Sequence, residues 1–312
     1  MISVKEENGI ILLVLENEEI RTEAAPQLGG KFTSVYNKSL EKEFLWRNTS
    51  LRLEKQEPGA DYDTNFWGGI DELIPNDIPE TVDGIGYPDH GELWTTALDY
   101  EIKDDQVILS GLLPESGLSY QKTVSLTTGK PEIEISYCIR NTSREVRHFL
   151  WKLHAALQIS EGDRLLTTAS TGCIVYPGSS RFPDNGPFAW PEIEGTDASV
   201  VPPQNGTMDF FYLWGAAEGA MSMISGGNAF RFGYQYDRAV FPYQWYFASY
   251  GQFRGHYTAI LEPASAMPVS VNEAAGLGQC TVLRPGEEIN TKVIIYAGAV
   301  SAEVGKNSLQ AR

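Results

Sequence analysis

Three titratable residues, Glu262, His154 and His90, are the first candidates for chemistry in this sequence. Carboxylates and imidazoles are the side chains that enzymes most often use to move protons at neutral pH. Only four histidines occur in 312 residues, so each one is considered separately as a candidate. Acidic residues are plentiful, so an acidic residue is a candidate only where its position in the sequence is unusual.

Glu262 follows the apolar run from Ala259 to Leu261 and directly precedes Pro263. The proline keeps the backbone of the preceding residue extended. An acid at the end of an apolar strand, with that backbone, is placed to project from a sheet toward a cleft. The alternative is an ordinary acid at a strand end.

His154 lies in a bulky apolar segment, residues 150–157. On a strand, alternate side chains share a face, so Leu150, Lys152 and His154 point one way and the residues between them the other. A polar pair among large apolar residues predicts a face that lines a cavity. The alternative is a core histidine that donates to a backbone carbonyl.

His90 lies in residues 87–94, where Pro88 and Gly91 indicate a turn. A histidine at such a turn is free to face a cleft, and the alternative is an exposed loop residue. His148 is expected at the solvated start of a strand. His256, beside Tyr257, is expected to be either exposed or directed at a cleft.

Two further features fit a ligand cleft. Asp71 and Glu72 follow Gly68 and Gly69, and such glycines permit sharp turns or the close approach of a ligand. Aromatic residues gather in two places, and sugar rings stack on aromatic planes, although a large core also uses aromatic residues. The clusters are Phe66, Trp67 and Trp94, and residues 241–247 with Tyr250 and Phe253.

Strand signals dominate the chain. Residues 132–139 alternate polar and apolar side chains, and residues 107–110, 120–126 and 292–296 resemble them. Turn residues separate these runs, and no long amphipathic helix pattern occurs. Residues 176–205, which include Trp190, are rich in Pro, Gly and Asp and are expected to pack as a long loop over one end of the fold. We therefore predict an all-β protein, a large antiparallel β-sandwich formed by one domain over residues 1–312.

The composition excludes several classes. A net charge of −17 and a pI of about 4.7 disfavour nucleic acids and anionic membranes as partners. No apolar run is long enough for a membrane span, and no signal peptide is recognisable, so we expect a cytoplasmic protein. Three widely spaced cysteines make disulfides and a cysteine-based zinc site improbable. The motifs of P-loop, dinucleotide, serine hydrolase and zincin sites are missing.

Several segments together resemble the galactose mutarotase-like superfamily, which includes the aldose 1-epimerases. The similar segments occur in family order along almost the whole chain, and together they are moderately specific. They are residues 26–35, residues 68–75, Pro88-Asp89-His90-Gly91 with Trp94, residues 151–154, residues 257–263 and residues 283–287.

The resemblance implies a supersandwich with a sugar cleft, and an aldose 1-epimerase (mutarotase) that interconverts α and β anomers. Glu262 would be the base that takes the proton of the anomeric hydroxyl. His154 would protonate the ring oxygen, and His90 would hold the sugar. Such a reaction consists of proton transfers and needs no metal or cofactor. The residues expected to contact the sugar are Asp71, Arg47 and Trp190.

The sequence also departs from this family. The Asn-Arg-Ile segment of the galactose type is missing, and Glu92 stands where phosphosugar-type relatives have an arginine. A neutral sugar is therefore the expected partner, because a buried phosphate without a cation is unfavourable.

Two other functions remain open: a non-catalytic sugar-binding protein, and a glycoside hydrolase or lyase on a similar sandwich. The hydrolase needs a second carboxylate opposite Glu262, for which the sequence offers Asp71, Glu72 and Asp184.

Overall fold

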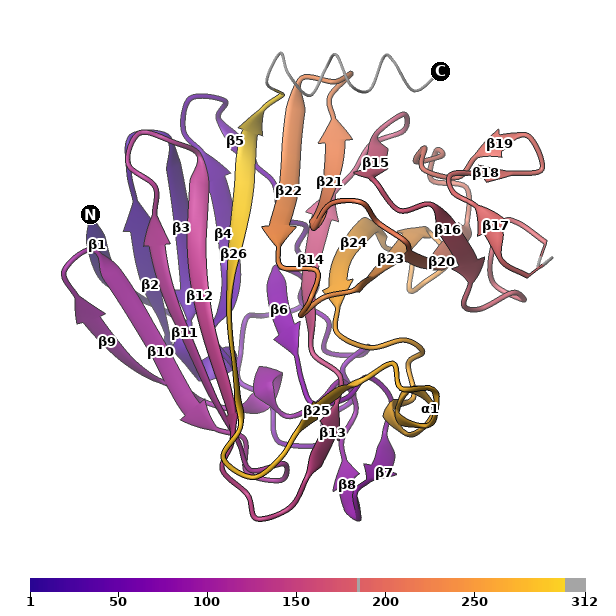
Figure 1. Cartoon of the computed structure of the whole chain (residues 1–312). Coiled ribbons are helices and arrows are strands. Elements are labelled where there is room, and N and C mark those ends of the chain that lie inside the picture. Colours follow the sequence, from indigo (N-terminus) through magenta and orange to yellow (C-terminus); the bar gives the residue numbers. More distant parts are fainter. Residues whose placement is uncertain (184–185, 301–312) are drawn as a thin grey trace.

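The computed structural model describes residues 1–183 and 186–300 and shows two large antiparallel β-sheets (Figure 1). One sheet has 12 strands and the other has 8. Their facing sides share one apolar core, which draws on residues from Leu13 to Ala297. The predicted all-β sandwich is therefore confirmed, whereas its organisation as a single domain stays a prediction.

The larger sheet carries the candidate residues near its middle. Its strands, in spatial order, are β1 (Ile2–Glu7), β2 (Ile10–Glu16), β3 (Ile20–Ala25), β4 (Lys31–Asn37), β6 (Ile70–Leu73), β14 (Lys152–Gln158), β24 (Tyr257–Ala264), β23 (Tyr243–Tyr250), β20 (Thr207–Trp214), β16 (Thr171–Ile174) and β17 (Phe188–Ala189). The short strand β5 (Lys42–Glu43) pairs with β4.

The smaller sheet covers one face of the larger sheet. Its strands, in spatial order, are β15 (Arg164–Thr167), β21 (Ala220–Ser225), β22 (Phe230–Tyr236), β26 (Glu288–Ala299), β12 (Glu132–Asn141), β11 (Leu118–Leu126), β10 (Gln106–Leu112) and β9 (Asp99–Lys103).

Short elements connect the sheets. Three strand pairs lie outside them: β7 (Glu80–Val82) with β8 (Ile85–Tyr87), β13 (Arg147–Phe149) with β25 (Thr281–Leu283), and β18 (Glu192–Ile193) with β19 (Thr196–Asp197). Among the described residues, the helices are the 3-10 turns η1 (Pro26–Leu28) and η2 (Leu93–Thr95) and the helix α1 (Val271–Leu277). Within residues 1–183 and 186–300, no helix is long and apolar enough to cross a membrane.

Residues 132–139, which alternate polar and apolar side chains, lie in a strand with one buried face, as predicted. In β12, alternate side chains from Ile133 to Ile139 are buried against the other sheet, and those between them are half-buried. The other three predicted runs lie within β10, β11 and β26. Hydrophobic alternation thus located these strands because one face of the smaller sheet meets the core and the other faces outward.

The central strands of the larger sheet are buried on both faces. Every residue of β6 is buried, and β14 and β24 are buried except at one end. One face of these strands packs on the smaller sheet, and loops and aromatic side chains cover the other. Such strands lack simple alternation. Their second face holds the candidate functional residues.

Residues 176–205 form more structure than the predicted loop. They contain β17, which extends the edge of the larger sheet, and the small pair β18–β19 (Figure 1). The segment nevertheless lies at one end of the large sheet. Its first residues, Tyr176 and Ser179, contribute to the cavity described below.

Candidate active site

A cavity of about 380 Å³ lies on the loop-covered face of the larger sheet. It is lined by side chains from the four adjacent strands β14, β24, β23 and β20 and from the loops that cross them. The lining residues are Tyr62, Asp63, Phe66, Asp77, Ile78, Asp89, His90, Lys152, His154, Tyr176, Ser179, Met208, Phe210, Phe247, Phe253, Ile260 and Glu262. The three candidates for proton chemistry are therefore in one place.

The alternation of side chains along a strand directs Lys152, His154 and Glu262 into the cavity. On β14, Lys152 and His154 face it, whereas Leu153 points into the core between the sheets. On the neighbouring strand β24, Glu262 faces the cavity, and Leu261 packs in the same core. The prediction that Lys152 and His154 share one face of a strand is confirmed.

Glu262 is almost completely buried, with a side chain 2% exposed. Its Oε2 lies 2.6 Å from Nζ of Lys152 on the adjacent strand. Burial raises the pKa of the Glu262 carboxyl above its ordinary value, although the Lys152 ammonium opposes this shift. A carboxylate with a raised pKa is a stronger proton acceptor than an exposed one.

Lys152 lies between two carboxylates. Its Nζ is 2.5 Å from Oδ1 of Asp77 and 2.6 Å from Oε2 of Glu262, and it lies 4.5 Å from the centre of the Trp245 ring. Burial alone would lower the pKa of Lys152, but the two carboxylates outweigh burial and raise it. Lys152 is therefore a permanent cation and no candidate for a neutral nucleophile.

His154 lies in a different electrostatic environment. Its Nδ1 is 3.4 Å from the hydroxyl of Tyr62, and that hydroxyl donates to Oδ2 of Asp71 at 2.7 Å. Burial, and then the nearby cations Lys152, His90 and Lys31, hold the pKa of His154 well below its ordinary value. His154 is therefore a neutral imidazole at neutral pH.

His90 sits in a tight turn after β8. It adopts a left-handed backbone conformation with φ of 56°, which is uncommon for a residue other than glycine and is often found at functional sites. The next residue must be glycine, because a Cβ on Gly91 would lie 2.2 Å from the carbonyl oxygen of Ile74. This close approach fixes the turn against the end of β6.

The His90 imidazole contacts two carboxylates. Its Nδ1 lies 2.8 Å from Asp89 Oδ1, its Nε2 lies 3.8 Å from Asp77 Oδ1, and its ring stacks on Tyr62 with centroids 4.3 Å apart. Burial alone would lower the pKa of His90, but Asp77 and Asp89 outweigh it and raise the pKa above the ordinary value. The pKa values of the two imidazoles of the cavity are thus shifted in opposite directions.

Aromatic side chains form the rest of the wall. Phe66, Tyr176, Phe210, Phe247 and Phe253 line the cavity, and Phe247 meets Phe253 edge to face with centroids 5.5 Å apart. Flat apolar walls with a few polar groups at one end are typical of small-molecule sites. The arrangement suits a ligand that has both apolar C–H faces and hydroxyl groups.

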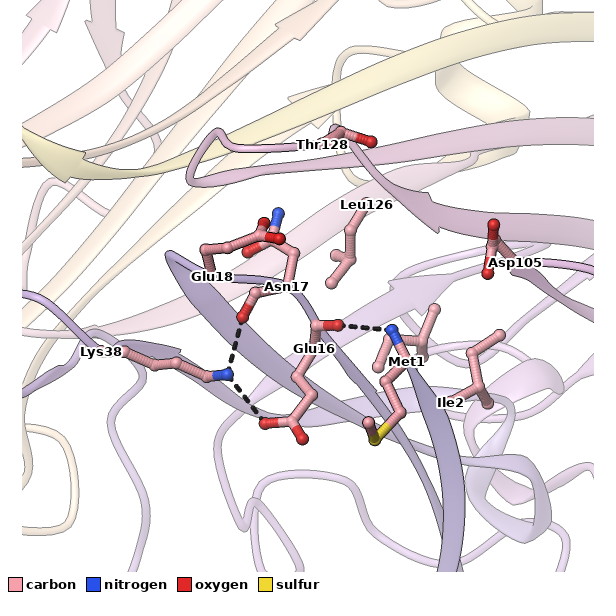
Figure 2. A pocket seen from close by; sticks show the side chains of 10 residues that line it. Met1, Ile2, Glu16, Asn17, Glu18, Lys38, Asp105, Leu126 and Thr128 are labelled. Atoms are coloured by element: carbon pink, nitrogen blue, oxygen red, sulfur yellow. Dashed lines mark hydrogen bonds and ion pairs between the residues drawn. The ribbon is translucent and has the colours of Figure 1, made fainter.

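A second cavity of about 400 Å³ opens near the N-terminus (Figure 2). Lys38 reaches into it and contacts Glu16 and the backbone oxygen of Asn17 at 2.9 and 2.6 Å. Its ten lining residues, all in the described part of the chain, include no histidine and no aromatic residue. The cavity around Glu262 is therefore the candidate active site.

No protein-family model matches the sequence, and no curated protein matches it significantly. Solved structures do match. A protein from Escherichia coli K12 with a provisional assignment as an aldose 1-epimerase has a TM-score of 0.71 at 15% identity, over 94% of this chain and 100% of its own. A galactose mutarotase-like protein from Clostridium acetobutylicum has a TM-score of 0.70 at 13% identity, over 96% and 99%. One from Lactobacillus casei has 0.64 at 16% identity, over 92% and 99%.

The chain has the galactose mutarotase-like fold. Identities this low show the fold and not the activity, so the roles of individual residues are argued from their geometry. In this mutarotase-like sandwich, the cavity lies across the middle strands of the larger sheet, where Glu262 and His154 occupy neighbouring strands.

The three residues expected to contact a sugar lie outside the cavity lining. Asp71 is buried behind Tyr62 and pairs with Lys31 at 2.5 Å. Arg47 is partly exposed and pairs with Glu43 at 3.1 Å. Trp190 packs against Phe188 and Phe211 beside β17. Their role as sugar contacts stays a prediction, and the unliganded structure gives it no geometric support.

Glu92 also differs from its expected place. Its carboxylate accepts hydrogen bonds from the backbone N–H groups of Glu115 and Ser116 at 2.6 and 3.0 Å, and it does not line the cavity. Glu92 therefore gives no support to the preference for a neutral sugar, which stays a prediction. Glu72 points into the core between the sheets, and Asp184 lies outside the described residues.

Sequence reasoning missed two cavity residues, Asp77 and Tyr62. Asp77 follows the apolar end of β6 in a polar pair with Asn76, which was a usable signal of the same kind as that at Glu262. Tyr62 lies in an irregular segment without any pattern, and only the tertiary structure places it against both histidines. His148 and His256 do not line the cavity.

The described residues contain no group of three His, Cys, Asp or Glu side chains able to hold a metal ion. The polar groups of the cavity instead include four carboxylates, one ammonium and two imidazoles. Such a set can accept a proton at one point and donate one at another.

Proposed function

We propose that this protein is an aldose 1-epimerase that interconverts the α and β anomers of a sugar. The observation that carries the proposal is that Glu262, His154 and His90 line one cavity although they lie far apart in the chain. The mutarotase-like fold supports the same reaction class. The aromatic wall offers stacking surfaces for the apolar faces of a sugar ring.

In the proposed reaction, Glu262 takes the proton of the anomeric hydroxyl while an acid protonates the ring oxygen. The ring opens, the aldehyde rotates about its bond to the rest of the sugar, and closure on the other face gives the other anomer. The proton returns by the reverse transfers. Burial supports the role of Glu262 because it makes the carboxylate more basic than an exposed glutamate.

Two imidazoles are available as the acid. The family resemblance favours His154, but the pKa of His154 lies well below its ordinary value, so its imidazole is neutral at neutral pH. The pKa of His90 is raised by its two carboxylate partners, so His90 is the more readily protonated of the two imidazoles. We therefore propose His90 as the proton reservoir and His154 as a neutral hydrogen-bonding partner of the sugar.

The substrate we propose is a neutral sugar. Four carboxylates line the cavity, those of Asp63, Asp77, Asp89 and Glu262, and the ammonium of Lys152 is engaged by two of them. A phosphate group would meet these negative charges without a free cation. A 6-phosphate should therefore weaken binding relative to the same sugar without it.

Glycoside hydrolysis is a second candidate, because Asp77 and Glu262 contact the same Lys152 nitrogen. The two carboxylates of retaining glycosidases lie about 5–5.5 Å apart, and this pair is comparably close. The ammonium, however, occupies the space between them where a sugar carbon would have to lie. This position favours the epimerase over the hydrolase.

The test is a polarimetric assay on pure anomers of several neutral aldoses, with the same sugars as 6-phosphates and with oligosaccharides assayed for cleavage. Glu262→Gln keeps the shape of the side chain but removes the proton acceptor. Anomer interconversion should fall by about 10²-fold or more, while sugar affinity stays near that of the wild type. Glu161→Gln, on an exposed residue, serves as the matched control.

Three outcomes would contradict the proposal. Equal acceleration by the wild type and by Glu262→Gln would remove Glu262 as the base. Sugar binding without any acceleration over the spontaneous reaction would identify a binding protein. Cleavage of an oligosaccharide in place of anomer interconversion would identify a hydrolase or lyase.

A further inference from the structure

The cavity contains a row of five titratable side chains in which carboxylates alternate with basic groups. In spatial order they are Glu262, Lys152, Asp77, His90 and Asp89. The successive contacts between their charged atoms are 2.6, 2.5, 3.8 and 2.8 Å. The acid–base roles proposed above use only the glutamate and the histidine, and the three other members have no assigned task.

The row is assembled from separate parts of the fold. Glu262 comes from β24 and Lys152 from β14, whereas Asp77 follows β6 and His90 follows β8. Strand pairing sets the positions of the first two, and the turn fixed by Gly91 sets the position of the histidine. Except for Asp89 and His90, which are adjacent in the sequence, the members of the row meet only in the folded protein.

Lys152 fixes the position of the Glu262 carboxylate. Its side chain is only 3% exposed and lies over the Trp245 ring, so the ammonium cannot turn away to solvent. Among the described residues, Glu262 Oε2 accepts no hydrogen bond of normal geometry. The ammonium contact is thus what holds this oxygen in place.

Asp77 connects the lysine to the histidine. Its Oδ1 contacts the Lys152 ammonium and lies 3.8 Å from His90 Nε2. Its backbone oxygen accepts a hydrogen bond from the His90 N–H at 2.7 Å. One residue therefore fixes the backbone of the histidine and faces its ring with a negative charge.

We propose that Lys152 and Asp77 are positioning residues that hold Glu262 and His90 in their reactive arrangement through this row of alternating carboxylates and basic groups. The proposal rests on the proposed epimerase function for its kinetic part only. Lys152 keeps the carboxylate ionised and oriented, and Asp77 keeps the imidazole protonated and oriented. Neither residue needs to exchange a proton with the sugar.

Other titratable groups also face the row, and their charges influence the pKa values of its members. Asp63 and Tyr62 face His90 from the segment before β6, and His154 faces it from β14. Tyr176 faces the row from the loop after β16. The titratable groups that line the cavity, and that a pH experiment reports on, are Tyr62, Asp63, Asp77, Asp89, His90, Lys152, His154, Tyr176 and Glu262.

The first experiment needs no catalytic activity. The imidazole C–H signals of the wild type and of Asp77→Asn are followed by NMR as a function of pH, with His90→Gln used to assign the His90 signal among the four histidines. Loss of the Asp77 charge should lower the pKa of His90 by about one unit or more. An unchanged His90 titration in a folded Asp77→Asn protein would overturn the role of Asp77.

The second experiment measures the pH dependence of anomer interconversion in Lys152→Met and Lys152→Arg. Without its cation, the pKa of Glu262 should rise, so the acidic limb of kcat/KM should move up by about 1–3 pH units in Lys152→Met. The KM should change little, and Lys152→Arg should keep the limb near its wild-type position. Lys38→Met, which removes a lysine from a surface pair with Glu16, is the matched control.

The outcomes separate the two proposals. If the wild type accelerates no anomer interconversion, the epimerase fails, and the NMR titration still decides whether the row sets the state of His90. If the wild type is active but Lys152→Met keeps the wild-type pH profile, the positioning role of Lys152 is wrong. A mere folding defect would lower activity equally at all pH values and would leave both titrations unmoved.

Discussion

Lys122 and Lys152 are the two most buried lysines among the described residues, and they lie in different surroundings. Lys122 lies between the sheets and reaches Glu72 with its Nζ 2.9 Å from both carboxylate oxygens. Lys152 lies on the opposite face of the larger sheet and touches two carboxylates in the cavity. Adjacent strands of one sheet thus support two ionic clusters on opposite faces.

The cluster between the sheets is complete. Both oxygens of Glu72 accept from Lys122, and the Tyr137 hydroxyl donates to Glu72 at 2.8 Å. Burial is the dominant influence there and lowers the pKa of Lys122, although Glu72 opposes it. A buried pair with well-formed hydrogen bonds links the two sheets and has no polar atom available to a ligand.

The cluster in the cavity is incomplete. Among the described residues, Asp77 Oδ1 and Glu262 Oε2 lack hydrogen bonds of normal geometry, although the ammonium of Lys152 is close to both. Unused hydrogen-bonding capacity at a buried carboxylate is costly, and such sites are often functional. Both clusters contain buried charges, so buried charge alone does not identify the candidate site. What distinguishes the site is that, within the described part of the chain, carboxylate oxygens beside a cavity lack hydrogen bonds of normal geometry.

The largest expected effect is on stability, in the complete cluster. Lys122→Met leaves Glu72 as a buried charge without a partner, so the free energy of unfolding should fall by about 3–5 kcal/mol. Denaturant unfolding measures it. Lys38→Met, at a half-exposed surface pair, should lose less than about 1 kcal/mol. Similar losses in both variants would mean that the intersheet pair is no more important than a surface pair.

The pH dependence of kcat/KM tests the ionic cluster in the cavity. Glu262 must be ionised, so kcat/KM should fall as the pH drops through its pKa, which is raised above 4.5. His90 must be protonated, so kcat/KM should fall again as the pH rises through its pKa, which is raised above 6.5. A basic limb below 6.5 would instead identify His154, whose pKa is lowered, as the acid.

Replacing both Lys122 and Glu72 should restore most of the stability that is lost in Lys122→Met. In Lys122→Met with Glu72→Met, no charge is left unpaired, and apolar pairs of similar volume are often as stable as buried ion pairs. The free energy of unfolding should return to within about 1 kcal/mol of the wild type, and anomer interconversion should be retained. A double variant as unstable as Lys122→Met would show that the Tyr137 hydroxyl, left without its acceptor, dominates the loss.

The smallest effect is expected at Arg47. Its guanidinium pairs with Glu43 and lies 5.5 Å from the centre of the Trp67 ring, at a partly exposed position outside the cavity. Arg47→Ala should change the free energy of unfolding by less than about 0.5 kcal/mol and kcat/KM by less than about twofold. A clear rise in KM would restore Arg47 as a sugar contact and would show that the cavity extends toward it when ligand binds.

The sequence by itself determined the fold class and singled out Glu262, His154 and His90, which all line the cavity. Period-two alternation predicted β12 because that strand has one buried and one outward face, and burial in the structure follows the same period. The position of Glu262 before a proline, and the shared face of Lys152 and His154, follow from backbone rules that act within a few residues. Such local rules are readable without knowing which strands are neighbours.

Only the tertiary structure decided which charges meet. Asp71 and Glu72 are consecutive in sequence, yet alternation sends Asp71 toward Tyr62 and Lys31 and sends Glu72 into the intersheet core, so neither lines the cavity. Asp77 and Lys152 meet across 75 residues of chain because β6 and β14 are adjacent in the sheet. Electrostatic contacts depend on distances between side chains, and strand order, which local sequence does not encode, sets those distances.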